Sequence, residues 1–168
     1  MIRQLRRKRQ ALSREACIAL LQRATSGVLA LRDAGPWPYA VPLSYVYHQE
    51  KLYFHSATRG HKLDALRENP GASFCVIGED RVMPGELTTC FRSVIAFGTV
   101  GVVEDAAEKR QAMRRLAMKY APDVGAERVE AEIAREWKRL CVLAFSIEYL
   151  SGKQAIELVA RCGREGVS

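Results

Sequence analysis

Strand-like segments of this chain follow one another in sequence and are joined by turn residues, instead of alternating with helices. The first two flank the stretch "RDAGPWP", whose aspartate, glycine and proline residues favour a hairpin loop. This order favours an α+β fold, an antiparallel barrel with helices packed outside it, over a parallel doubly wound sheet. The strand-like segments cover 27–31, two strands within 39–57, then 72–79, 91–105 and the first part of 140–158.

Three features predict where the sheet pairing stops. Pro42 lies inside a strand-like run, and a proline cannot donate a hydrogen bond to a sheet ladder. We therefore expect an edge strand, a bulge or a gap facing a ligand at that position. The polar segment 80–90 is expected to be irregular, and a turn is expected at Ser151–Gly152.

Capping residues predict four helices between these strands. Ser13 can cap the first of them, and Pro70 stops the second. Asp105 and Glu108 have the spacing of a capping box at the start of the third. The predicted helices cover 13–24, 61 to the "ENPG" segment at 68–71, 105–120 and 125–139.

Most of the positive charge lies at the N-terminus. The formal net charge is +7, and residues 1–10 contain five of the basic residues and no acidic one, so the remaining chain carries only +2. Such a distribution argues against a broad nucleic-acid surface, although binding through residues 3–9 is an alternative with a steep salt dependence. We interpret 1–10 as a basic arm, 11–160 as a single domain and 161–168 as a C-terminal tail.

The five cysteines and the hydropathy pattern suggest a cytoplasmic protein. The number of cysteines is odd and no two lie close together, which argues against a disulfide framework and against a CxxC site. No apolar run approaches the roughly 18 residues that a membrane-spanning helix needs. We therefore expect reduced cysteines, a cytoplasmic location and no membrane partner.

The stretch "LYFHSATRGHKLDAL" changes from strand-like to helix-like within a few residues. The start of a helix offers free backbone amides and the positive end of a dipole, and phosphate groups bind such sites. Gly60 would let the backbone approach a ligand, while His61 and Lys62 would add charge and Ser56 a hydroxyl donor. The stretch predicts a phosphate site; a capped surface helix with exposed cations is the alternative.

A second polar junction precedes the long strand in "TTCFRSVIAFG". Arg92 could form two hydrogen bonds to a phosphate or carboxylate, but Ser93 should face the opposite side unless the strand bends. An ordinary arginine at a sheet edge is the alternative.

Familiar enzyme signatures are missing, since the sequence has no GxSxG, HExxH, Walker or GxGxxG motif. We therefore assign no catalytic residue and predict no metal site, although His55 and His61 could share an ion. If the protein performs chemistry, a bound cofactor is expected to carry it.

The ordered combination of these motifs resembles a known family. The segments "VPLSYVYHQEKLYFHSATRGHKLDALRENPGASFCV", "TTCFRSVIAFGTVGVVEDAAEKRQAMRRLAMKYAP" and "LAFSIEYLSGKQAIE" are similar to the pyridoxamine 5′-phosphate oxidase-like, FMN-binding split-barrel superfamily. Within it they are most similar to the nitroimidazole-resistance (Nim) flavoproteins. The similarity extends over nearly the whole chain, and it depends on the combination of motifs more than on any one of them.

The resemblance implies a six-stranded antiparallel split barrel that works as a homodimer with FMN at the subunit interface. It implies that one strand lines the flavin ring and that a second segment holds the phosphate. Two further segments would border the site, and the one that contains Arg92 and Ser93 could come from the neighbouring subunit. The ring would be lined by Pro42, Leu43, Ser44 and Tyr45, with His55 nearby. The phosphate would be held by Ser56, Gly60, His61 and Lys62, and bordered by Arg92, Ser93, Lys153 and Gln154.

Three departures from the family pattern affect these expectations. Phe91 stands where relatives often have a tyrosine, which removes a hydroxyl donor. His61 stands where relatives often have lysine or arginine, so phosphate binding could be weaker or depend on pH. The arginine-rich C-terminal signature of true pyridoxamine phosphate oxidases is missing, which argues against vitamin B6 oxidation.

The resemblance therefore implies an FMN-dependent oxidoreductase. It would take electrons from NAD(P)H or another protein and pass them to a small electron-poor acceptor such as a nitroaromatic compound. One alternative is a flavin-binding or storage module without turnover. Another is a haem-binding split barrel with His55 or His61 as the iron ligand.

Overall fold

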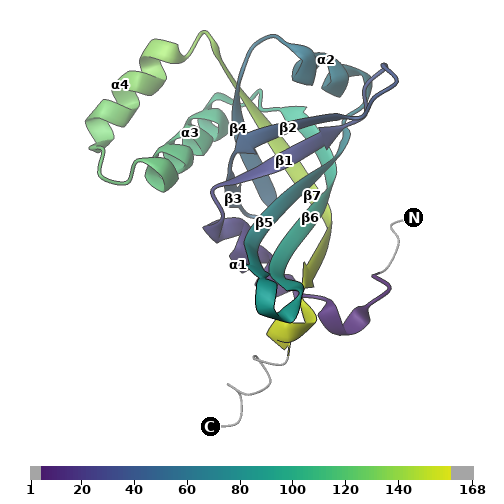
Figure 1. Cartoon of the computed structure of the whole chain (residues 1–168). Helices are drawn as coiled ribbons and strands as arrows, with labels where there is room; N and C mark the ends of the chain where they lie inside the picture. Colours follow the sequence, from purple (N-terminus) through teal and green to yellow (C-terminus); the bar gives the residue numbers. More distant parts are fainter. Residues whose placement is uncertain (1–4, 160–168) are drawn as a thin grey trace.

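A single antiparallel sheet of seven strands forms the centre of the molecule in the computed structural model, which describes residues 5–159 (Figure 1). The order of strands in the sheet is β2-β1-β5-β6-β7-β4-β3. The strands are β1 (Ser26–Leu31), β2 (Tyr39–Ser44), β3 (Val46–His48), β4 (Lys51–Ala57), β5 (Gly71–Met83), β6 (Thr88–Val102) and β7 (Leu140–Gln154).

The two edge strands of the sheet are consecutive in sequence, and this curves the sheet into a barrel. β2 and β3 are edge strands, and only Tyr45 separates them along the chain. An open sheet whose edges meet in this way must curve. Among residues 5–159 no ladder pairs β2 with β3 or β4, so the barrel is split there. The expected α+β split barrel is confirmed, with seven strands instead of six because Tyr45 interrupts the segment that we expected as one strand.

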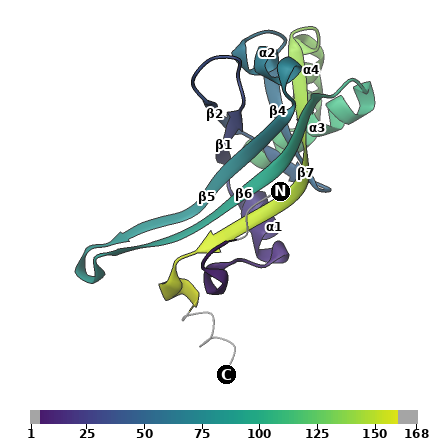
Figure 2. The ribbon, with the colours of Figure 1, turned by 90° about the vertical axis from the view of Figure 1, so that its right-hand side faces the viewer.

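The hairpin of β5 and β6 is longer than the sequence suggested. It continues through 80–90 to a 3₁₀ turn at Pro84–Glu86 and projects beyond the barrel (Figure 2). The expectation of an irregular segment was therefore wrong, because the polar residues of this segment pair across the two strands. Pro42 does lie on an edge strand, as predicted.

The turn expected at Ser151–Gly152 was also wrong, since β7 runs through both residues. Gly152 pairs with Val94, and its carbonyl oxygen accepts a hydrogen bond of 3.0 Å from the Leu12 amide. A Cβ atom at this position would lie 2.3 Å from the Cys17 sulfur. The glycine therefore allows close packing of a neighbouring segment and does not mark a turn.

The barrel interior is filled by aromatic and aliphatic side chains. Tyr45, Phe54 and Phe74 are fully buried, and the rings of Tyr45 and Phe74 meet edge to face with centroids 4.9 Å apart. One end of this core is covered by α1 (Arg14–Arg23), whose buried face includes Leu21. The predicted cap is present, because the Ser13 hydroxyl accepts a hydrogen bond of 3.2 Å from the Ala16 amide.

Two helices pack beside the barrel and one lies at its end (Figure 1). α2 (His61–Glu68) is the short helix, and α3 (Ala106–Tyr120) and α4 (Ala126–Glu136) form a helical hairpin. Glu130 of α4 holds this hairpin together, since its carboxylate contacts Arg110, at 3.0 Å, and Arg114 of α3. Asp105 caps α3 as predicted, but the Glu108 carboxylate binds Lys51 and Tyr53 and does not close a capping box.

Part of the predicted N-terminal arm packs against the barrel. Lys8–Gln10 forms a 3₁₀ turn, Gln10 is buried, and Ala11 pairs with Lys153 of β7. The packed part of the chain thus begins before residue 11. The predicted tail, 161–168, lies outside the described residues.

No helix in the described part of the chain is long and apolar enough to cross a membrane. Four of the five cysteines lie within residues 5–159, and none of these four forms a disulfide.

Candidate functional site

A cavity of about 960 Å³ lies between the strands and the α3–α4 hairpin. Its strand side contains Ser44 of β2 and His55, Ser56 and Ala57 of β4, so the structure brings together three residues that the sequence assigned to one site. The helical side combines apolar and charged residues. It consists of Met113, Leu116, Ala117, Tyr120, Ala121, Val124, Arg128, Val129, Glu132, Ile133, Arg135, Glu136 and Arg139, and Leu140 of β7 adjoins it.

The edge strand β2 presents alternate residues to the outside. Pro42 and Ser44 are exposed on one face, whereas Leu43 points inward and packs against the core. Because Pro42 has no amide hydrogen and lies on an edge, it leaves no ladder donor unpaired. Pro42 and Ser44 are therefore open to a ligand, and Leu43 could contact one only through its backbone.

The polar groups of Tyr45 all contact other residues of the chain. Its side chain is fully buried, and its hydroxyl donates a hydrogen bond of 2.6 Å to the Leu21 carbonyl. Burial raises the pKa of this hydroxyl well above its usual range. Its backbone amide and carbonyl both contact the Tyr120 hydroxyl. The expectation that Tyr45 lines a flavin finds no support in this geometry.

The N-terminus of α2 is open and uncapped. Gly60 adopts φ 130°, a left-handed value that favours glycine, and no side chain caps the helix. The Gly60 carbonyl accepts from the amides of Leu63 and Asp64, which leaves the two preceding amides without a partner among residues 5–159. A Cβ atom at Gly60 would meet nothing within 4 Å, so a ligand can approach the backbone here.

The residues around this helix start suit a phosphate group. Lys62 is half-buried and has no carboxylate within 4.0 Å in the described part of the chain. Ser56 is buried, lines the cavity and lies four residues before Gly60. Free amides, one lysine and a hydroxyl form a donor set that fits an anion of this kind.

His61 lies at the same helix start, but its ring points towards the loop that joins β1 and β2. Its Nε2 lies 2.6 Å from the Asp33 carboxylate, and the ring stacks on Tyr39 with centroids 4.0 Å apart. The hydrogen bond from His61 holds the pKa of the Asp33 carboxyl below its usual range. The sequence did not predict this pair, and it occupies a side chain that we had assigned to a phosphate.

The second predicted group also comes together, at the start of β6 and the end of β7. Arg92 pairs with Gln154 and Ser93 with Lys153 in the sheet register. The Arg92 Nε donates a hydrogen bond of 3.3 Å to Gln154 Oε1, and an Nη1 atom lies 3.9 Å from the Glu79 carboxylate.

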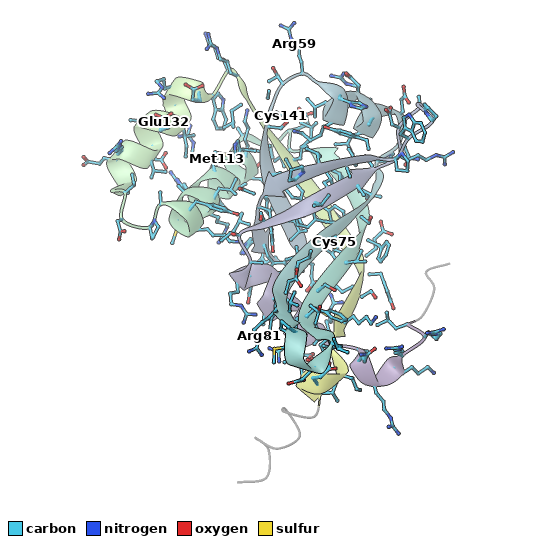
Figure 3. All side chains as sticks on the ribbon, viewed as in Figure 1. Arg59, Cys75, Arg81, Met113, Glu132 and Cys141 are labelled. Atoms are coloured by element: carbon cyan, nitrogen blue, oxygen red, sulfur yellow. The ribbon has the colours of Figure 1, made fainter. Side chains whose placement is uncertain are left out.

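These two groups lie at opposite ends of the barrel. Ala57 pairs with Leu140 at one end of β7, and Arg92 pairs with Gln154 at the other. Arg92 and Val102 both lie on β6, ten residues apart. Because each residue of a strand spans about 3.3 Å, roughly 30 Å of strand separates them. Figure 3 shows the same separation, with Arg59 beside α2 at one end of the molecule and Arg81 of the β5–β6 hairpin at the other. One chain therefore cannot place both groups around one small ligand.

The helical side of the cavity was not predicted from the sequence. Val129 and Ile133 gave a visible apolar stripe on α4, but the pattern could not indicate that this stripe faces a cavity shared with β4. The contact depends on how α4 folds back on α3, and the Glu130 ion pairs that fix it join residues 16 to 20 positions apart.

Solved structures of known proteins share this architecture. A candidate 5-nitroimidazole antibiotic resistance protein from Bacteroides thetaiotaomicron is 21% identical, with a TM-score of 0.71 and 86% of each chain covered. A conserved hypothetical protein of Mycobacterium tuberculosis is 14% identical, with a TM-score of 0.79 and 92% of each chain covered. An FAD- and haem-binding protein of Mycobacterium smegmatis is 25% identical, with a TM-score of 0.71, covering 92% of this chain and 80% of its own.

The family assignment comes from the sequence itself. No curated protein matches the chain. Residues 13–154 match the family model described as pyridoxamine 5′-phosphate oxidase, and this match begins at the cap of α1 and ends with the last residue of β7. The chain therefore belongs to the pyridoxamine 5′-phosphate oxidase family of split barrels.

Proposed function

We propose that this protein binds FMN and uses it to reduce a small electron-poor acceptor such as a nitroaromatic compound. The observation that carries the proposal is the cavity between β4 and the α3–α4 hairpin, whose strand side ends at Ala57, three residues before Gly60 at the uncapped N-terminus of α2. A cavity for the ring next to an anion site is what a flavin nucleotide needs.

The phosphate would be held at the start of α2. The amides of His61 and Lys62 have no hydrogen-bond partner among residues 5–159, so an anion could bind them without breaking a hydrogen bond. The Lys62 ammonium and the Ser56 hydroxyl would add further donors. Lys62 acts here as a point charge. Because Asp33 already pairs with His61, we assign His61 only a minor role in phosphate binding.

The ring would lie against the strand side of the cavity. Pro42 and Ser44 form the exposed face of the β2 edge, and His55 of β4 is exposed in the same cavity. When bound, the flavin supplies reversible two-electron chemistry. The His55 imidazole has no hydrogen-bond partner among residues 5–159, so its ring nitrogens are free to hydrogen-bond a ligand in the cavity.

A second copy of the chain would complete the site. The group formed by Arg92, Ser93, Lys153 and Gln154 lies too far from α2 to reach the same phosphate within one chain. A two-fold axis can bring this group of one subunit next to α2 of the other. Exposed apolar side chains on β5 support such a contact, since Ile77 is 64% and Val82 67% exposed.

The visible spectrum of the purified protein tests the proposal. We expect a flavin spectrum and release of FMN, not FAD, on denaturation. NADPH should bleach the flavin under anaerobic conditions, and a nitroaromatic compound should restore the colour. Each turnover would oxidise one NADPH and convert a nitro group to a nitroso group, with uptake of one proton and release of one water.

Each other outcome argues against the proposal, in part or as a whole. A protein that takes up no flavin would contradict it completely. Flavin that binds but transfers no electrons to any acceptor would support the storage alternative. A haem absorption band in place of the flavin spectrum would indicate a haem-binding barrel with a histidine ligand.

A further inference from the structure

We infer that the electron acceptor carries an anionic group, such as a carboxylate, and that Arg128 recognises it. This inference rests on the proposed function, because it assigns the part of the cavity that a flavin would leave open. It depends on three properties of α4: which of its arginines are free, where they lie, and what surrounds them.

Three arginines of the α4 segment line the cavity, and one of them is neutralised within the segment. Arg135 contacts Glu132 and, with its Nε atom at 3.1 Å, Glu136. Arg128 and Arg139 have no carboxylate within 4.0 Å in residues 5–159. Both acidic residues of this wall thus pair with Arg135, and two free guanidinium groups face the cavity.

The two free arginines lie at different ends of the cavity. Arg139 precedes Leu140, which pairs with Ala57 three residues before Gly60, so Arg139 lies on the phosphate side. Arg128 lies eleven residues earlier, and the eight positions from Arg128 to the end of α4 at Glu136 alone rise about 12 Å. The same cavity wall includes Tyr120, the last residue of α3, and Val124 of the loop between α3 and α4. Arg128 is therefore the cation that remains once a phosphate occupies the α2 side.

The surroundings of Arg128 suit the body of an aromatic acid. Val124 and Val129 are apolar and lie on either side of it in sequence, and Met113 of α3, labelled in Figure 3, lines the same cavity. A flat apolar ring could occupy this region while its carboxylate pairs with the guanidinium. Arginine forms two parallel hydrogen bonds to a carboxylate, which an amide of the same shape cannot match.

A matched pair of ligands tests this assignment: 4-nitrobenzoate and its neutral analogue 4-nitrobenzamide. We would titrate both into the oxidised, flavin-loaded protein by calorimetry, without NADPH, so that binding is measured without turnover. We expect about tenfold tighter binding of the carboxylate, the range of one charge-assisted hydrogen-bonded pair. Arg128→Gln should abolish this preference, and in turnover it should raise KM for the carboxylate with little change in kcat.

Lys138→Gln is the matched control, because it removes one positive charge just beyond α4 without altering the cavity wall. Equal binding of the two ligands to the wild-type protein would overturn the inference, as would equal effects of Arg128→Gln and Lys138→Gln. If Arg139→Gln abolishes the preference and Arg128→Gln does not, the carboxylate binds at Arg139, and the inference is also overturned. In all these cases the flavin spectrum persists, whereas its absence would remove the proposed function and this inference together.

Discussion

The Tyr120 hydroxyl lies 2.8 Å from the amide nitrogen and 2.8 Å from the carbonyl oxygen of Tyr45. The last residue of α3 thus holds the single residue at which β2 gives way to β3. The same hydroxyl contacts the Thr25 carbonyl, just before β1. It accepts from the Tyr45 amide and has one proton to share between two carbonyl oxygens. This contact connects the helical hairpin to the split of the barrel, and the Tyr120 ring lines the cavity.

Tyr120→Phe should therefore lower the free energy of unfolding by about 1–2 kcal/mol, because it leaves the Tyr45 amide without its partner. Denaturant unfolding measures the change. Tyr149→Phe is the control, since the Tyr149 hydroxyl makes no hydrogen bond within residues 5–159. Equal stability of the two variants would show that the contact contributes nothing.

Lys62→Met should weaken FMN binding about tenfold, because it removes the one lysine at the open end of α2. Quenching of flavin fluorescence gives the dissociation constant. Lys138→Met serves as the control for the loss of one positive charge elsewhere. If both variants bind FMN as tightly as the wild type, the phosphate does not lie at α2.

Asp33→Asn should strengthen FMN binding about twofold to threefold, because it removes a negative charge beside the proposed phosphate site and releases His61. The same fluorescence titration measures this effect. Glu68→Gln removes an exposed acidic residue at the opposite end of α2 and should change little. Weaker binding in Asp33→Asn would mean that the pair with His61 organises the site instead of competing with it.

Glu108→Gln should destabilise the protein at pH 7 by about 1 kcal/mol, and the difference should disappear in acid. Hydrogen bonds from Lys51 and Tyr53 hold the pKa of the Glu108 carboxyl below its ordinary value of 4.5. A lowered pKa means that the folded state binds fewer protons than the unfolded state. The stabilisation is thus complete above pH 4.5 and is lost as the pH falls through the lowered pKa. Thermal unfolding of both proteins across this range tests the sign, and a gap that widens in acid would contradict it.

Gly98→Ala should destabilise the protein by about 3 kcal/mol or prevent folding, because the new Cβ has no room. It would lie 1.9 Å from the Ser146 carbonyl oxygen, at the bulge between β6 and β7, and backbone atoms cannot move aside cheaply. Gly101→Ala is a sharp control three residues along the same strand, where a Cβ meets nothing within 4 Å. Comparable unfolding curves for the two variants would mean that the bulge adapts.

The parts of the fold that depend on local chemistry could be predicted from the sequence. The caps at Ser13 and Asp105 set the starts of α1 and α3, and Pro42 indicated an edge strand. The extension of the β5–β6 hairpin through 80–90 could not be predicted. Its stability depends on cross-strand pairing, which a run of polar residues does not indicate. At Gly152 the local signal suggested a turn, but the packing of Cys17 and Leu12 explains the glycine.

The sequence predicted a few of the residues that line the cavity, but not the contacts that shape it. Ser44, His55 and Ser56 do share one cavity. The pairing of His61 with Asp33 and the use of both Tyr45 backbone groups by Tyr120 are contacts between residues 28 and 75 positions apart. No spacing rule along the sequence indicates such contacts, because they arise only when the barrel and the helices have packed.

The proline in the edge strand β2 has a consequence for the solubility of the protein. An exposed strand edge normally invites pairing with strands of other molecules, which leads to aggregation. At Pro42 an incoming strand would find no amide hydrogen, and the rigid ring would obstruct its approach. The same residue that keeps this edge accessible to a small molecule thus discourages the growth of the sheet from one protein molecule into the next.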